Sequence, residues 1–312
     1  MDADSPLFSI VVPTFNREGH IGRCLESIAR QSYQDYEVVV VDNASSDGTV
    51  EVALGFDWRL NVSVLVNDSN RERSYSRNRG AEHARGKYVV FLDSDDELRP
   101  DSLEFAAAFV EADPEHRFFF QLLTFVDEAG VTVYEPVIRR GHSMRRTLAE
   151  GNPLSCSGVF VERLLFLAHR FNEAPELVGS EDWHCWIRIA AEHEPVVCRG
   201  GGALLVDHSS RTISSDSWQD AEKRFDFLAD DLLVDPVVSS YLAPHLGLFR
   251  GTQEHYVAVK AMGQSAFRVS FVRLARAIRH HPGLLLTRRT MHLFRLWLSG
   301  LSRTTGRNRY DG

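Results

Sequence analysis

The chain has 312 residues, of which 44% are hydrophobic and 25% are charged, and its formal net charge is −8. This length allows a large buried core, and the composition is that of a soluble enzyme with one elaborated domain and a C-terminal tail. Four scattered cysteines without a Cys-x-x-Cys pair argue against a zinc site or a disulfide framework, and because no secretory leader and no apolar stretch of transmembrane length are found, we expect a cytoplasmic protein.

Strand and helix patterns alternate along the first third of the chain. Short continuous apolar runs are typical of strands buried in a parallel sheet, and Ile21, Leu25 and Ile28 recur at helical spacing. The alternation predicts right-handed crossovers and an α/β fold with a mostly parallel sheet flanked by helices. The expected strands are Phe8–Val12, Tyr36–Val41, Val62–Val66 and Tyr88–Leu92, and the expected helices follow Arg17, begin near Thr49 and run from Arg77 to Gly86.

Three carboxylates, those of Asp93, Asp95 and Asp96, follow the fourth predicted strand. Like charges this close repel each other, and a divalent cation relieves the repulsion. Carboxylate oxygens suit Mg²⁺ or Mn²⁺, which usually add water and substrate phosphates to their ligands. Because ligands of open α/β sheets lie outside the carboxyl ends of the strands, the motif predicts a metal–diphosphate site, with a solvated acidic turn as the alternative.

Other motifs accompany the acidic one in a fixed order: Ile10–Arg17, Val39–Asp47, Arg77–Gly80 and Phe91–Asp96. Together they resemble the nucleotide-binding half of a family 2 glycosyltransferase of the GT-A fold, over residues 7 to about 110. The resemblance resumes at Gly179–Trp183, Trp186–Ala190 and His208–Ser210. It implies a metal-dependent, inverting transfer of a sugar from a nucleotide-diphosphate donor, a UDP-sugar by preference, to a hydroxyl of a glycan or glycolipid acceptor.

The resemblance places the donor nucleotide at the ends of the predicted strands. Asp42 would accept a hydrogen bond from the imide N–H of uracil, which favours uridine or thymidine donors. Asn43 stands where the family commonly has a second aspartate, so Asp42 carries the base contact. Asp93 would reach the ribose. The expected donor-nucleotide-binding residues are Pro13, Thr14, Phe15, Arg17, Asp42, Arg73, Arg77, Asp93 and Ser94.

Two residues are expected to hold the metal, which the resemblance implies is Mn²⁺ or Mg²⁺. Asp95 is the first, since the last aspartate of the family's Asp-x-Asp motif holds the ion. His208 is the second, because related enzymes carry a histidine in a similar C-terminal segment, and imidazole binds Mn²⁺ better than Mg²⁺. His208 follows a predicted strand at Ala203–Val206.

Asp182 is the predicted general base. It lies in the first turn of a helix expected from Ser180 or Glu181 to about Glu192, where the helix dipole keeps a carboxylate ionised. An in-line displacement needs only one such base and a counter-charge for the leaving diphosphate. Glu181 would orient the acceptor or the donor sugar, and Trp183 would stack on a pyranose face unless it is a packing residue.

The remaining elements belong to the second half of the chain. Residues 118–140 predict two strands joined by a turn at Asp127–Gly130, and residues 153–161 resemble the segment beneath the donor sugar. We therefore expect a nucleotide-sugar-binding half at 1–110, an acceptor-binding half at 111–218 and a helical C-terminal extension at 219–312.

Charge is distributed unevenly, because residues 263–312 carry ten arginines against Asp311 alone. That segment is +9, which leaves −17 for the rest of a chain whose net charge is −8. Apolar residues recur at helical spacing, so basic amphipathic helices are expected there. Such helices bind an anionic membrane surface, here the inner face of the membrane, or pack as a helical cap or homodimer surface. Nucleic acid is not an expected partner, because no binding motif accompanies the charge.

Two other functions fit parts of the sequence. A sugar-1-phosphate nucleotidyltransferase shares a related sheet and metal chemistry, but it needs a Gly-rich basic loop after the first strand. Pro13–Arg17 lacks those glycines. A non-catalytic carbohydrate-binding module is disfavoured because both the acidic motif and the Glu181–Asp182 pair are present.

Overall fold

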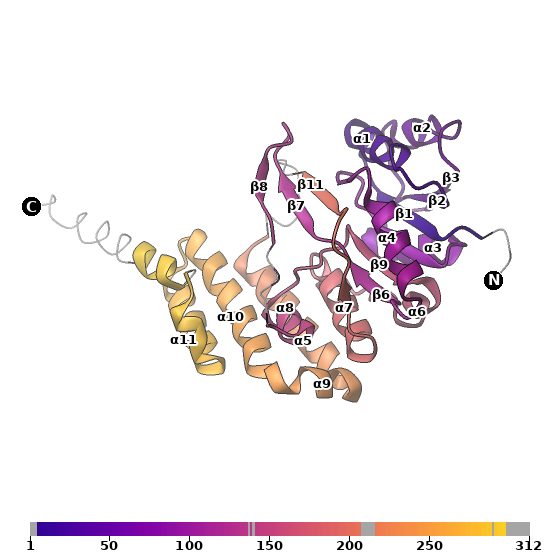
Figure 1. Ribbon diagram of the computed structural model, residues 1–312. Coiled ribbons are helices and arrows are strands. Elements are labelled where there is room, and N and C mark those ends of the chain that lie inside the picture. The colour runs from indigo at the N-terminus through magenta and orange to yellow at the C-terminus, as the bar shows by residue number, and fades with distance from the viewer. Residues whose placement is uncertain (1–4, 137, 139–140, 207–215, 289, 298–312) are drawn as a thin grey trace, which may run out of the picture. The chain divides into compact units, whose positions relative to one another are not determined.

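The computed structural model describes residues 5–136, 138, 141–206, 216–288 and 290–297 (Figure 1). These residues form two compact units. Unit 1 comprises the described residues up to 144 and from 152 to 206. Unit 2 comprises residues 145–151 and the described residues from 216 onward. Helix α5 (Met144–Glu150) therefore lies almost wholly in unit 2.

Unit 1 is built on a seven-stranded sheet with the order β10-β6-β9-β4-β1-β2-β3. All neighbouring strands are parallel except at β9, which is antiparallel to both β4 and β6. The predicted α/β fold with a mostly parallel sheet is therefore confirmed. The strands are β1 Phe8–Thr14, β2 Tyr36–Asp42, β3 Val62–Val66, β4 Tyr88–Phe91, β6 Phe118–Phe120, β9 Val159–Glu162 and β10 Val196–Val197.

Alternate residues of a strand point to opposite faces of a sheet. The strands of this sheet carry buried apolar residues on both faces, and helices cover both. On one face, Ile10 and Val12 of β1 share a core cluster with α1 and α4. On the other face, Val11 meets α3 at Gly80. The helices of unit 1 are α1 Glu18–Ala29, α2 Thr49–Leu54, α3 Glu72–His83, α4 Ser102–Ala112, α6 Arg163–His169, the 3₁₀ turn η1 Pro175–Leu177 and α7 Glu181–Glu192.

A second, four-stranded sheet in unit 1 has the order β5-β11-β7-β8. The predicted turn at Asp127–Gly130 joins β7 and β8, which pair antiparallel, and the Gly130 amide donates to the Asp127 carbonyl at 2.9 Å. The strands are β5 Glu97–Leu98, β7 Leu123–Val126, β8 Thr132–Tyr134 and β11 Ala203–Val206. His208, which follows β11, lies outside the described residues.

Helix α3 begins earlier than predicted. It starts at Glu72 instead of Arg77, so Arg77 lies inside the helix rather than at its beginning. The extra turn is polar and lacks the apolar periodicity that identifies a helix in a sequence. The added turn allows the side chains of Arg73 and Arg77 to lie on one side of the same helix.

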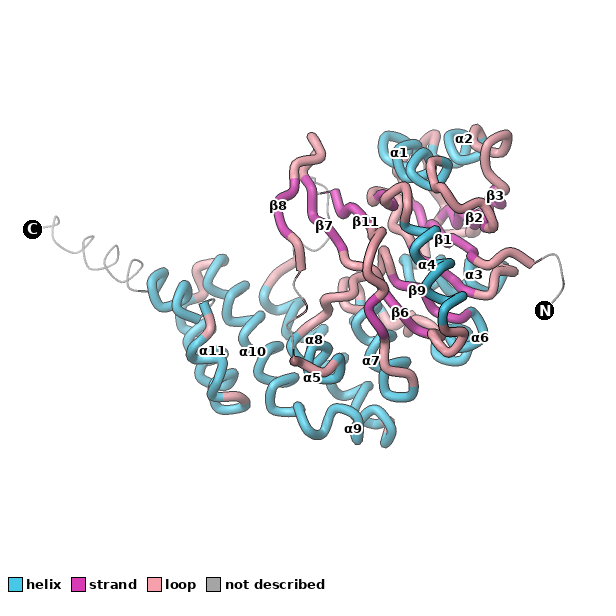
Figure 2. Tube along the Cα trace, viewed as in Figure 1, coloured by secondary structure: helices cyan, strands magenta, loops and turns pink. Residues whose placement is uncertain are grey.

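The described part of unit 2 consists of helices and loops (Figure 2). Among the described residues no single helix is long and apolar enough to cross a membrane. The helix pair Trp218–Val234 and Pro236–Gly263, which is bent by 111°, is long and apolar enough only when its two helices are taken together. After α5, the helices are α8 Trp218–Val234, α9 Pro236–Leu242, η3 Ala243–His245, α10 Leu246–Gly263, α11 Phe267–His280 and η4 Pro282–Leu286, and residues 290–297 are also helical.

Candidate active site

Two buried polar atoms mark the ends of β1 and β2. These strands pair in parallel register, which places Thr14 opposite Asp42. Asp42 Oδ2 accepts a hydrogen bond from the Ser45 amide at 2.9 Å, whereas Asp42 Oδ1 and Thr14 Oγ1 have no partner. Unpartnered buried oxygens are costly, so their occurrence side by side indicates a binding site. This is the edge at which the sequence places the nucleotide base.

The loops after these strands hold unusual backbone conformations. Asn16 follows β1 with φ of 50°, and Ala44 follows β2 with φ of 65°. Non-glycine residues in the left-handed region are sparse and cluster at ligand sites. Pro13 is buried beneath this edge, whereas Phe15 is 40% exposed. Among the predicted base-framing residues, Phe15 therefore offers the most accessible side chain.

The carboxylates of the acidic loop after β4 differ in burial and in their partners. Asp96 is buried and accepts a hydrogen bond from Ser157 Oγ at 2.8 Å. Ser157 Oγ also receives the Asp93 amide at 3.2 Å, so one serine braces both ends of the loop. Ser94 is buried between them. Asp95 stays partly exposed, and its Oδ2 lies 3.7 Å from Arg17 Nε.

Arg77 is the centre of the site rather than a surface contact. Its side chain is 1% exposed, with Nη2 2.5 Å from Asp93 Oδ1 and Nη1 2.9 Å from Glu181 Oε1. Burial lowers the pKa of Arg77, but the charges of Asp93 and Glu181 outweigh it, so the pKa is raised and the group stays cationic. Its guanidinium is enclosed by two carboxylates and connects the loop after β4 to α7, and its contact with the donor stays a prediction.

Glu181 is likewise internal. Its side chain accepts from Arg77 and, through Oε2, from the Gly179 amide at 2.7 Å, and Arg73 Nε lies 3.8 Å from Oε1. Burial raises the pKa of Glu181, but Arg77 and Arg73 outweigh this effect and lower it overall. These contacts give Glu181 a structural role within the protein, and its contact with a sugar stays a prediction.

Asp182 differs from its neighbour because it is partly exposed. Its Oδ2 accepts from Asn152 Nδ2 at 2.8 Å, and its Oδ1 accepts from the Trp183 amide at 2.7 Å. Burial of the carboxyl group and then the charge of Glu181 raise the pKa of Asp182 to about 6. A general base works best when its pKa lies near the operating pH, so Asp182 suits proton removal near neutrality. Adjacent carboxylates thus acquire opposite shifts, a pattern typical of acid–base sites.

Trp183 points into the protein and is only 5% exposed. This burial favours the packing alternative over a stacking platform for a sugar. Trp186, one turn further along α7, is fully buried against Phe91 and Phe171 and donates from Nε1 to the Ser155 carbonyl at 2.7 Å. Both tryptophans serve to fix α7, and hence Asp182, in place.

The residues fit a divalent cation only with help from a substrate. In the part of the chain that the structure describes, no three His, Cys, Asp or Glu side chains are clustered to hold a metal ion. Mg²⁺ sites commonly use one or two carboxylates together with waters and substrate phosphates. Asp95, a partly exposed hard-oxygen ligand at the strand ends, matches that pattern.

Sequence reasoning missed Asn152 and Ser157. Both lie in the segment before β9. Ser157 is 61 positions from Asp96, and Asn152 is 30 positions from Asp182. The only sequence signal was the Ser155–Gly158 cluster, which resembles the segment beneath the donor sugar. Neither hydrogen bond could be inferred from spacing.

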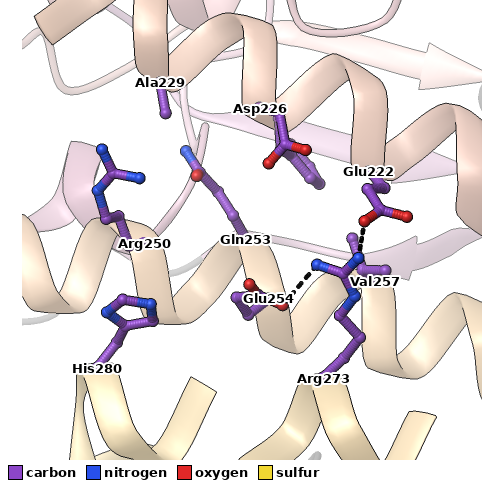
Figure 3. Close-up of a pocket in the computed structure, with 10 residues that line it drawn as sticks. Glu222, Asp226, Ala229, Arg250, Gln253, Glu254, Val257, Arg273 and His280 are labelled. Atoms are coloured by element: carbon purple, nitrogen blue, oxygen red, sulfur yellow. Dashed lines mark hydrogen bonds and ion pairs between the residues drawn. The ribbon is translucent and has the colours of Figure 1, made fainter. Parts of the chain in front are cut away.

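Unit 2 contains a small charged cavity between α8, α10 and α11 (Figure 3). Arg273 bridges Glu222 and Glu254, with Arg273 Nη1 3.1 Å from Glu254 Oε2. Burial raises the pKa of Glu254. None of the predicted site residues lines this cavity, and its ion pairs join three helices.

The fold defines a class of protein, an α/β protein with a large, mostly parallel sheet flanked by helices and polar side chains gathered at the strand ends. Residues 9–159 match the family described as "Glycosyl transferase family 2". The chain belongs to this family, has the GT-A fold and is a glycosyltransferase.

Relatives share this assignment. A protein of Haemophilus influenzae named an uncharacterized glycosyltransferase is 28% identical over 228 residues, which cover 72% of this chain and 76% of that protein. TarS residues 1–349 of Staphylococcus aureus, solved with UDP-GlcNAc, superpose with a TM-score of 0.62 at 20% identity, covering 88% of this chain and 89% of that one. The mannosyltransferase PcManGT of Pyrobaculum calidifontis, solved with GDP-Man and Mn²⁺, gives 0.58 at 19% identity, covering 98% and 88%. At these identities the two structures establish the fold.

Proposed function

We propose that this protein is a metal-dependent, inverting glycosyltransferase that uses a UDP-sugar and a hydroxyl of a glycan or glycolipid. The observation that carries the proposal is Asp182, a partly exposed carboxylate in the first turn of α7 whose pKa is raised to about 6. An ion-pair chain through Glu181 and Arg77 connects its helix to Asp93 on the donor side. These ion pairs support a proposal in which the base on α7 and the leaving-group site beside Asp93 are held by the same side chains.

In the proposed reaction, Asp182 removes the proton of the acceptor hydroxyl as its oxygen attacks C1 of the donor sugar. The new C1–O bond forms while the bond from C1 to the diphosphate oxygen breaks, and the nucleoside diphosphate leaves with the electron pair. Attack from the opposite side inverts the anomeric centre, and no covalent intermediate is needed. A divalent ion held by Asp95 would supply counter-charge to the leaving diphosphate.

A uridine donor is supported by the polar atoms at the strand ends. Asp42 Oδ1 is an acceptor without a partner, which suits the imide N–H of uracil, and Thr14 Oγ1 beside it can accept or donate. TarS was solved with UDP-GlcNAc, which favours the same donor class. PcManGT was solved with GDP-Man and Mn²⁺, so it supports a metal cofactor but does not support uracil as the nucleobase of the donor.

A thermal-shift panel tests the donor and the metal together. Because a ligand that binds only the native state raises apparent stability, UDP-sugars with Mn²⁺ should raise the melting temperature. GDP-sugars, and UDP-sugars with a chelator, should raise it less. An equal response to GDP and UDP donors would contradict the uridine assignment, and an equal response without metal would contradict the role of Asp95.

The two other functions are weaker. Family 2 membership and the raised pKa of Asp182 favour transfer over passive binding. A nucleotidyltransferase would consume a sugar phosphate and a nucleoside triphosphate instead of a nucleotide sugar. Release of nucleoside diphosphate, rather than pyrophosphate, distinguishes the two reactions.

We further propose that α11 and the helix at 290–297 bind anionic membrane from the cytoplasmic side. Residues 263–297 contain no Asp or Glu, and Arg268, Arg279, Arg288 and Arg295 are exposed. Large apolar side chains are exposed on the same elements, including Phe271 of α11 at 60% and Phe294 of the helix at 290–297 at 39%. A homodimer through this surface would bring arginines of two copies together, so an anionic partner fits the charge better.

Liposome flotation tests this surface with phosphatidylglycerol and phosphatidylcholine vesicles. We expect binding to phosphatidylglycerol alone and its loss at high salt, because salt screens surface charge. The double variant Arg268→Gln with Arg279→Gln should weaken binding by on the order of 25-fold, since each surface arginine contributes about 1 kcal/mol. Arg199→Gln, an exposed arginine of unit 1, is the control. A protein that stays unbound under every condition contradicts the membrane proposal.

A further inference from the structure

Asn152 holds a position that the roles described above do not explain. It lies in the loop before β9, and its Nδ2 donates to Asp182 Oδ2 at 2.8 Å. Its Oδ1 is buried without a partner. A buried oxygen without a hydrogen-bond partner is destabilising. The hydrogen bond from Nδ2 to Asp182 is therefore what holds the amide in this orientation.

The loop that carries Asn152 is tied to the site at several points. Ser155 adopts φ of 55°, and its carbonyl accepts from Trp186 Nε1 at 2.7 Å. Ser157 donates to Asp96 at 2.8 Å. The loop is thus fixed to α7 on one side and to the acidic loop on the other, which orients Asn152 toward Asp182.

The carboxylate of Asp182 is then constrained through both oxygens. Oδ1 receives the Trp183 amide at 2.7 Å from its own helix, and Oδ2 receives Asn152 from a distant loop. Each oxygen keeps a second lone pair, and Asp182 is partly exposed. One lone pair is therefore available to an incoming hydroxyl in a fixed direction.

Resting on the proposed function, we propose that Asn152 is a positioning residue for the acceptor half of the reaction. Its Nδ2 fixes the rotamer of Asp182 and stabilises the carboxylate form that removes the acceptor proton.

The charges around Asp182 determine what removal of Asn152 would do. Glu181 on α7 and Asp93 after β4 favour the protonated form of Asp182, and Arg77 on α3 opposes them. The thiols of Cys156 and Cys185 are also close enough to interact with Asp182. A hydrogen bond donated to the charged form favours that form, so losing Asn152 must raise the pKa of Asp182.

The test is the pH profile of kcat/KM for the acceptor, measured with the full chain, a UDP-sugar and Mn²⁺. The acid limb of the wild type should lie near pH 6. Asn152→Ala should move that limb to higher pH and lower kcat/KM at neutral pH by about 10–100-fold, the effect of a hydrogen bond to a charged group. Asn152→Asp should move it further, because two carboxylates then meet.

Two further variants keep the outcome interpretable. Asn152→Ser retains a donor and should recover part of the rate and of the limb position. Asn78→Ala removes a buried asparagine that binds the Phe171 backbone and Glu173, and should change stability without moving the limb. A uniform loss of rate at every pH in Asn152→Ala, with the limb unmoved, would overturn the proposal. If Asp182→Asn itself retained full activity, the proposed function would fail instead.

Discussion

Asp182 connects the chemistry of the site to the stability of the fold. Its folded-state pKa of about 6 lies above the ordinary value of 3.8. Between these values the folded protein binds more protons than the unfolded chain, so the free energy of unfolding falls as pH rises through this window. Above pH 6 the molecule therefore carries an ionised carboxylate that costs stability, as expected of a group retained for function.

Asp182→Asn should remove that cost. At pH 4 the variant and the wild type should have similar free energies of unfolding, whereas at pH 7 the variant should be more stable by on the order of 1–3 kcal/mol. Urea denaturation at both pH values measures the difference. A variant that is equally destabilised at pH 4 and pH 7 would mean that Asp182 is a structural carboxylate.

Asp95→Ala tests the metal ligand. The variant should lose the Mn²⁺-dependent part of UDP binding, while its stability without ligand should change little because a partly exposed acid among like charges is removed. Calorimetric titration with UDP, with and without Mn²⁺, measures the effect. Asp96→Ala is the matched comparison, and it should instead destabilise the fold by removing the partner of Ser157. Unchanged Mn²⁺ dependence in Asp95→Ala would refute the assignment.

Residue types were easier to predict than side-chain directions. The sequence placed Asp42 and Asp182 at strand and helix ends, where the structure finds an unpartnered oxygen and a raised pKa. Arg77, Glu181 and Trp183 belong to equally recognisable motifs, yet all three point inward. Spacing along one element cannot reveal that a carboxylate from a distant segment encloses an arginine.

Helix α3 shows how the packing of one element determines the position of a side chain in the site. It packs on β1 and β2 at Gly80, where an added Cβ would overlap the side chain of Val11 and crowd Val41. The same helix carries Arg77 to Asp93 and Glu181. Close packing of helix on sheet therefore determines where the central arginine lies.

Gly80→Ala should disturb both the packing of α3 on the sheet and the position of Arg77. Overpacking of this kind typically costs about 1–3 kcal/mol, so we expect a lower melting temperature together with weaker UDP binding. Gly19→Ala on α1, where an added Cβ meets nothing within 4 Å, is the control and should leave both unchanged. Full stability in Gly80→Ala would show that α3 can move away from the sheet without consequence.

At the scale of the whole molecule, alternation of strands and helices was enough to predict a parallel sheet. The alternating pattern could not show that β9 inserts antiparallel between β4 and β6, because a strand's partners depend on the path of the chain. Nor could it show that residues 145–151 leave unit 1 for unit 2. Unit 1 resumes at Asn152, 30 positions before Asp182, and no sequence pattern links these two residues.

The most direct test measures nucleoside diphosphate released from UDP-sugars by the full chain with Mn²⁺ and glycan or glycolipid acceptors. The wild type should release UDP in an acceptor-dependent manner. Asp182→Asn should slow this release by on the order of 10²–10⁴-fold while leaving donor affinity unchanged, because a general base has been removed. Failure of every UDP-sugar to yield UDP, or an Asp182→Asn enzyme as fast as the wild type, would contradict the proposed transferase.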